Sequence, residues 1–122
     1  MYILMKVHKF ETSNPRECPV FDLMRKGEKT VEGRPYSKKY HKVQEGDRII
    51  FKHNGSTFKA RVKSVRRYKT LKGYLKGESL HRTLPCINRL DEAVEIYNKW
   101  SSPRRRQRLR QKYGYAMLAI RV

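Results

Sequence analysis

A hairpin signal in the middle of the chain constrains the fold most strongly. An apolar run, Ile49-Ile50-Phe51, is followed by Asn54-Gly55, a pair that tolerates positive φ and favours a tight turn. The residues after the turn alternate, apolar at Phe58, Ala60 and Val62 and basic at Lys59, Arg61 and Lys63. This segment predicts a β-hairpin with one face in the core. Its other face is expected to carry a row of three cations about 7 Å apart, because side chains on one face repeat every two residues.

The segments around the hairpin predict a mixture of strands and short helices. Strands are expected at residues 1–10 and 115–122, and helices at 19–26, 71–80 and 88–100. Pro19 suits the first helical position and Asn88 suits an N-cap. The resulting β-α-β-β-α-β order excludes a doubly wound parallel sheet and favours an α+β barrel or sheet closed by helices. The 122 residues match one domain, spanning 1–122.

The charge of the chain indicates the class of its partner. Lys and Arg number 30 against 11 Asp and Glu, a formal net charge of +19, which attracts polyanions. RNA is the leading candidate, DNA is the second, and an acidic protein is an alternative. A membrane partner is not expected, because the most basic segment has almost no apolar residues and no run is long enough to span a bilayer. The apolar N-terminus lacks a small-residue cleavage site, so an intracellular protein is expected.

Two basic segments are candidates for nucleic-acid contact. The first is an arginine cluster made of Arg104, Arg105, Arg106, Arg108 and Arg110. Five like charges without an acid repel one another and favour phosphate contact over a solvated helix face. The second is a loop in which Tyr36, Tyr40 and His41 lie among cations. Stacking on bases and ordinary loop packing are equally consistent with that loop.

The segment Gly27–Arg34 carries residues that could bind a ligand. If residues 29–34 are extended, Glu32 and Arg34 lie on one face and Lys29 on the other. A carboxylate accepts hydrogen bonds and a guanidinium donates a planar fork, so the pair can hold a ligand jointly. The alternative is a solvated strand with a surface ion pair, which contributes little.

The cysteines and histidines give no sign of a cofactor. The four His residues have no ligand spacing, so no metal site is expected, and no other cofactor is indicated. Cys18 and Cys86 are too few for a disulfide framework and are expected to fill the core as small apolar residues.

The order of several motifs resembles the activating-signal-cointegrator homology (ASCH) family. Gly-x-Lys-Thr-x-Glu-x-Arg at 27–34 is followed by Gly46-Asp47 and an apolar strand. The later motifs are Tyr68, Leu75, Glu78, Leu80, Leu84-Pro85, Asp91-Glu92-Ala93, Tyr97, Trp100-Ser101, Gly114, Ala119 and Ile120. Together they cover about residues 20–122. The resemblance implies a PUA-like mixed β-barrel flanked by short helices, with a cleft lined by Lys29, Glu32 and Arg34.

The resemblance also implies RNA-linked functions. Some small ASCH proteins hydrolyse 4-acetylcytidine with a Lys, a Thr three residues later and a Glu. Lys29 matches the Lys and Glu78 is the counterpart of the Glu, but Glu32 stands where that mechanism has its Thr. Other members are ribonucleases. If the chain is an enzyme, Lys29, Glu32 and Glu78 are the catalytic candidates.

These observations predict an RNA-binding domain with a nucleotide cleft at Lys29, Glu32 and Arg34. Its phosphate contacts are expected at the hairpin cations and the arginine cluster, and Tyr36 is the candidate for base stacking. A hydrolase acting on RNA or on a modified nucleoside, with Lys29 and Glu32 as a proton-transfer pair, is the first alternative. A basic protein-interaction module is the second.

Overall fold

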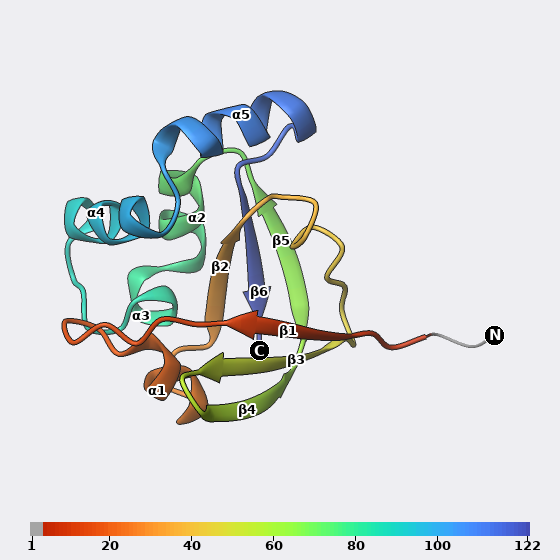
Figure 1. Cartoon of the computed structure of the whole chain (residues 1–122). Helices are drawn as coiled ribbons and strands as arrows, with labels where there is room; N and C mark the ends of the chain where they lie inside the picture. The colour runs from red at the N-terminus through yellow and green to blue at the C-terminus, as the bar shows by residue number, and fades with distance from the viewer. Residues whose placement is uncertain (1–3) are drawn as a thin grey trace.

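The computed structural model describes residues 4–122, and these residues form the predicted α+β fold (Figure 1). Its strands are β1 (Val7–Glu11), β2 (Val31–Pro35), β3 (Arg48–His53), β4 (Ser56–Arg61), β5 (Ser64–Tyr68) and β6 (Met117–Arg121). Its helices are α1 (Val20–Arg25), α2 (Leu71–Glu78), α3 (Leu80–Thr83), α4 (Leu90–Trp100) and α5 (Pro103–Tyr113).

The strands form two three-stranded sheets, in the orders β1-β3-β4 and β2-β6-β5. Strand β1 pairs with β3 in parallel, and every other pairing within the described residues is antiparallel. The sheets face each other across an apolar core that includes Phe10, Ile49 and Phe51 from one sheet and Leu118 and Ile120 from the other. Over residues 4–122 the arrangement is therefore two facing sheets rather than one continuous closed barrel.

Strand β6 lies between two apolar cores, and its side chains are therefore largely shielded from water on both faces. Leu118 and Ile120 point toward the other sheet, while Met117 and Ala119 pack in a second core together with residues of α2 and α4. Helices α2, α3 and α4 gather on that side of the β2-β6-β5 sheet (Figure 1). The alternation of side chains along a strand thus sends residues to two different cores. The predicted strand at 115–122 is confirmed, with slightly narrower bounds.

The hairpin prediction is confirmed in its pairing and in its turn. Phe51 lies opposite Phe58 and their rings stack, and Asn54 has a φ of +53°. The cations Lys59, Arg61 and Lys63 are exposed, although Lys63 lies beyond the end of β4. The predicted element order lacked β2 and β5. The sequence did not reveal β5 as a separate strand, because only residues 62–63 separate it from β4. After these residues the backbone pairs with β6 instead of β3.

Several predicted element boundaries shift. The first strand begins at Val7 rather than at residue 1, and positions 1–3 lie outside the described residues. Pro19 is the N-cap of α1, not its first helical residue, and Arg89 rather than Asn88 precedes α4. The helix expected at 71–80 divides at Ser79, whose φ of +78° ends α2 and whose hydroxyl accepts a hydrogen bond from the third residue of α3. None of the described helices is both long and apolar enough to cross a membrane.

Candidate functional site

Three charged side chains form a largely buried cluster, with Lys29 just before β2 and Glu32 and Arg34 within it. The Nζ of Lys29 is 3.4 Å from one carboxylate oxygen of Glu32, and Nη2 of Arg34 is 2.9 Å from the other. Lys29 is 1% exposed and Glu32 is 6% exposed. The interpretation as a solvated surface pair is therefore wrong. The prediction that Lys29 faces away from Glu32 is also wrong, because β2 begins only at Val31 and the strand alternation does not extend to Lys29.

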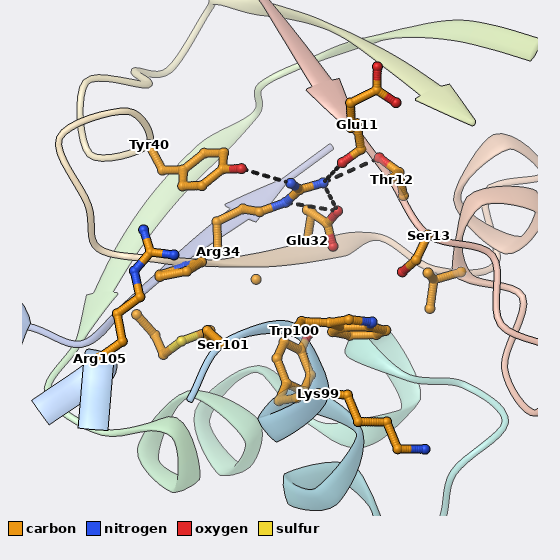
Figure 2. Close-up of a pocket in the computed structure, with 15 residues that line it drawn as sticks. Glu11, Thr12, Ser13, Glu32, Arg34, Tyr40, Lys99, Trp100, Ser101 and Arg105 are labelled. Carbon is orange, nitrogen blue, oxygen red and sulfur yellow. Dashed lines mark hydrogen bonds and ion pairs between the residues drawn. The ribbon is translucent and has the colours of Figure 1, made fainter. Parts of the chain in front are cut away.

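Neighbouring groups occupy the polar atoms of Lys29 and Arg34. Lys29 donates to the carbonyl oxygens of Val31 and Thr83. The guanidinium of Arg34 donates to the carbonyl oxygen of Glu11, the hydroxyls of Thr12 and Tyr40 and the Glu32 carboxylate (Figure 2). Its plane also lies near the rings of Phe10 and Tyr40, at 4.9 and 5.2 Å from their centroids. Arg34 therefore fixes the position of Glu32 and is not an open fork for a ligand.

The three charges shift one another's pKa values. Burial raises the pKa of the Glu32 carboxyl, but the charges of Arg34 and Lys29 outweigh burial and hold that pKa below its usual range. Burial lowers the pKa of Lys29, and the attraction of Glu32 offsets only part of this effect. The pKa of Arg34 is raised, because the nearby Glu32 carboxylate outweighs the effect of burial. Glu32 is thus an ionised carboxylate at neutral pH, and its oxygens can only accept hydrogen bonds.

Glu32 and Arg34 line a cavity of about 510 Å³. The pairing of β2 with β6 fixes one wall, and the last turn of α4 supplies the facing wall with Tyr97 and Trp100. Trp100 is 38% exposed and packs edge-on against the Tyr97 ring. Arg105 of α5 lies at another side of the cavity, and Glu32 and Trp100 lie across it from each other (Figure 2). The cavity therefore combines a fixed carboxylate, an accessible aromatic ring and an exposed cation.

The structure brings only some of the predicted site residues to this cavity. Glu32, Arg34 and Arg105 line it, and Lys29 contacts Glu32 without being among the lining residues. Tyr36 packs instead against His41, Tyr113 and Tyr115, as ordinary loop packing predicts. The other predicted cations are exposed and lie away from the cavity lining, at Arg104 and Arg108 on α5 and at Lys59, Arg61 and Lys63 on or after β4.

Glu78 forms its contacts with Tyr68 and Arg121 and not with Lys29 or Glu32. It is 1% exposed and lies 2.9 Å from the guanidinium of Arg121, and it also accepts a hydrogen bond from Tyr68. It is not among the residues that line the cavity. The catalytic candidates Lys29, Glu32 and Glu78 are therefore not brought to one accessible surface.

The expectation that the whole arginine cluster is exposed is wrong for Arg106. This side chain is buried, with 7% exposure, and its guanidinium donates to the backbone and hydroxyl of Ser101 and to Asn98. Residues 103–113 form a helix, whose side chains point in all directions around its axis, so the consecutive arginines cannot all face solvent. Arg106 faces inward and connects the end of α4 to α5. A replacement of Arg104, Arg105 and Arg106 together would therefore affect folding as well as binding.

The two cysteines differ in their environments. Cys18 is fully buried, as predicted, whereas Cys86 is exposed, so its predicted place in the core is wrong. Burial together with a hydrogen bond to Cys86 raises the pKa of the Cys18 thiol to about 12. Cys18 is therefore protonated and unreactive at neutral pH.

Sequence reasoning missed several residues of the cavity. The sequence indicates Trp100 only as part of a family motif, and it gives no role to Thr12 and Ser13. Trp100 could have been found from its place at the last position of an amphipathic helix, where its side chain is exposed. Thr12 and Ser13 have no such sequence signal. They follow the end of β1 and come close to β2 only in the folded structure.

Gly33 is the β2 residue that permits the close packing behind this cavity. A Cβ at this position would lie 2.3 Å from two atoms of the Tyr74 side chain, which is fully buried and bonded to the Tyr97 hydroxyl at 2.8 Å. We expect Gly33→Ala to lower the free energy of unfolding by about 1–3 kcal/mol, because the Tyr74 ring cannot move without losing that hydrogen bond. Urea unfolding measures the effect.

Gly55→Ala is the matched control for this substitution. Gly55 lies in the hairpin turn and a Cβ there meets nothing within 4 Å, so a change below about 0.5 kcal/mol is expected. Equal midpoints for Gly33→Ala and wild type would contradict the packing argument.

Two solved structures are similar to this chain. The crystal structure of hypothetical protein PH0355 is 29% identical, with a TM-score of 0.78 over 96% of this chain and 96% of that chain. The solution NMR structure of protein PF0455 from Pyrococcus furiosus is 26% identical, with a TM-score of 0.66 over 97% of this chain and 94% of that chain. No curated protein matches the chain.

The family comparison covers the candidate site. The ASCH domain model matches residues 17–121, a span that includes β2 with Glu32 and Arg34 and the α4–α5 segment with Trp100 and Arg105. This agrees with the resemblance of the sequence motifs. The chain belongs to the ASCH domain family.

Proposed function

We propose that this ASCH domain binds RNA and that the cavity at Glu32 holds one nucleotide base. The observation that carries the proposal is the arrangement of the cavity: the Glu32 carboxylate, fixed by Lys29 and Arg34, lies across from an accessible Trp100. The net charge of +19 supports a polyanionic partner, because it attracts phosphate over a long range.

Glu32 would supply the selectivity of the site. Its two oxygens contact Lys29 and Arg34, yet a carboxylate has about four lone-pair positions and so retains capacity for a ligand. An acceptor of this kind favours bases that present an amino group and disfavours a carbonyl edge. Because Arg34 and Lys29 hold the carboxylate in place, little side-chain entropy is lost when a base binds.

Trp100 would supply the stacking surface. Its ring is held from one side by Tyr97, at 5.0 Å between centroids, and is 38% exposed. Stacking of a base on an aromatic side chain contributes about 1–3 kcal/mol and tolerates any base. Trp100 thus takes the role that sequence reasoning gave to Tyr36.

Exposed cations would contact the phosphates. Arg105 lines the cavity, so it is placed for the phosphate nearest the bound base. The remaining exposed cations are Arg104 and Arg108 on α5 and Lys59, Arg61 and Lys63 along the hairpin. Contacts to phosphate set affinity and register but carry no base information.

A titration of the protein with short single-stranded RNA tests the proposal. Trp100 is the only tryptophan of the chain, so a base that stacks on it should quench the indole fluorescence in a saturable way. Trp100→Ala should bind RNA about 5- to 100-fold more weakly, measured by anisotropy of a labelled RNA. If the cavity binds no base, RNA should not quench the wild-type fluorescence, and Trp100→Ala should bind RNA as tightly as wild type.

Arg105→Gln and Arg82→Gln form a matched pair for the same titration. Each removes one exposed positive charge, but Arg82 lies on α3 and does not line the cavity. We expect the Arg105 variant to lose several-fold more affinity than the Arg82 variant. Equal losses would mean that net charge, and not this cavity, determines binding.

A further inference from the structure

A second cavity, of about 490 Å³, lies between α2, α4 and α5. Its walls come from the start of α2, from one face of α4, from α5 between Pro103 and Arg110, and from Ala116. The residues that line it include four cations and no Asp or Glu, and they are Lys69, Thr70, Leu71, Lys72, Val94, Asn98, Pro103, Arg106, Gln107, Arg110 and Ala116. Such a lining is typical of an anion site.

Arg106 gives this cavity a buried charge without a carboxylate partner. The guanidinium is 7% exposed, and its hydrogen bonds go to the carbonyl and hydroxyl of Ser101 and to the Asn98 side chain, 2.6 Å away. Across residues 4–122 no Asp or Glu oxygen lies within ion-pair distance of it. Buried charges are usually paired, so a bound anion would supply the missing negative charge.

The cations at the edge of the cavity are available to a ligand. Lys69 and Lys72 flank the start of α2, and Arg110 lies one turn after Arg106 on α5. All three are exposed, and in the described part of the chain none of them forms an ion pair. Together with Arg106 they place four positive charges around one cavity, which suits a phosphate better than a singly charged carboxylate.

The position of α5 relates the two cavities. Arg105 lines the first cavity and Arg106, the next residue, lines the second, so the start of α5 separates them. We propose that the second cavity binds a backbone phosphate of the RNA strand whose base occupies the first cavity. This inference rests on the proposed RNA binding and adds the path of the strand, which crosses the N-terminal end of α5.

Binding of RNA to a pair of double variants tests the path. Lys72→Gln/Arg110→Gln removes two charges from the cavity, and Lys76→Gln/Lys112→Gln removes two exposed charges from the same helices outside it. For an eight-nucleotide RNA at low salt, the first variant should lose about tenfold in affinity relative to the second. Its slope of log affinity against log salt should be shallower by about 0.7 for each phosphate that the variant no longer neutralises. A mononucleotide, which fits the first cavity alone, should bind both variants equally.

The outcomes separate this inference from the proposed function. If wild type binds the oligonucleotide but both double variants bind it equally well, the second cavity is not on the path and RNA binding stands. If wild type binds no RNA at low salt, the proposed function fails.

Inorganic phosphate provides a probe that does not depend on RNA. It should raise the melting temperature of wild type and of the Lys76→Gln/Lys112→Gln variant more than that of the Lys72→Gln/Arg110→Gln variant. An equal rise in all three proteins would contradict a phosphate site in this cavity.

Discussion

Replacing Glu32 with glutamine is expected to lower the free energy of unfolding by about 3–5 kcal/mol, because it leaves the buried Lys29 and the partly buried Arg34 without their shared counter-charge. The side-chain shape is kept, so the loss reports the charge. Urea unfolding at neutral pH measures it. Glu28→Gln, the same chemical change at an exposed position four residues earlier, should alter stability by less than about 0.5 kcal/mol.

The pH dependence of this difference gives a second measurement. The folded state depresses the pKa of Glu32, so its contribution to stability is present above the unfolded-state pKa of roughly 4.3. That contribution is lost as the pH falls through the folded-state pKa. The gap between wild type and Glu32→Gln should therefore be largest near neutrality and should narrow in acid. A gap that stays constant from neutral pH to acid would show that the carboxylate charge is not the cause.

The effect of this variant on binding has to be measured where it remains folded. If Glu32 accepts a hydrogen bond from a base amine, Glu32→Gln should bind RNA about 10- to 100-fold more weakly. If Glu32 were a catalytic base, binding would persist while turnover was lost. Adding Lys29→Met to Glu32→Gln should restore part of the stability, because the double variant lacks both charges of the Lys29–Glu32 ion pair.

The affinity for RNA is expected to fall steeply with salt. If about six phosphates are contacted, affinity should decrease about a thousandfold on a duplex and about 300-fold on a single strand between roughly 50 and 200 mM salt. The physical reason is the release of counterions from the nucleic acid when exposed Lys and Arg replace them. Anisotropy of a labelled RNA across a salt series measures the slope.

A comparison with DNA of the same sequence completes that experiment. The electrostatic part should be similar for both single strands, since it depends on phosphate spacing and not on the sugar. A salt-independent affinity would contradict a phosphate-dominated interface. An affinity only for an acidic protein partner would support the interaction-module alternative.

The elements that the sequence predicted best are those with strong local signals. Asn54-Gly55 and the alternation around Phe58 determine the hairpin, and the last strand was predicted at 115–122 and is observed at Met117–Arg121. The ordered motifs of residues 20–122 identified the ASCH family, which the match over residues 17–121 shows. In each case the information lies within a few neighbouring residues or in their order along the chain.

The features that the sequence could not predict depend on what packs from elsewhere. Strand alternation alone places Lys29 and Glu32 on opposite faces, but β2 begins only at Val31, and the Lys29 ammonium donates to the carbonyl of Thr83. The sequence of the arginine cluster predicts that all of its side chains are exposed. Arg106 is nevertheless buried, because it faces the end of α4 and donates to Asn98. The main cavity joins β1, β2, α4 and α5, so no single segment of the sequence carries its signature.

The pairing of β6 has a consequence for synthesis of the protein on the ribosome. Strand β6 is the central strand of its sheet, with Val31 and Ser64 both opposite Arg121, and it follows all the other strands in the chain. While the earlier residues emerge, β2 and β5 have no partner, and both cores lack the residues that β6 contributes. Folding of this sheet therefore waits for translation of its last strand, and until then the nascent chain exposes strand edges and apolar surface that nascent-chain chaperones recognise.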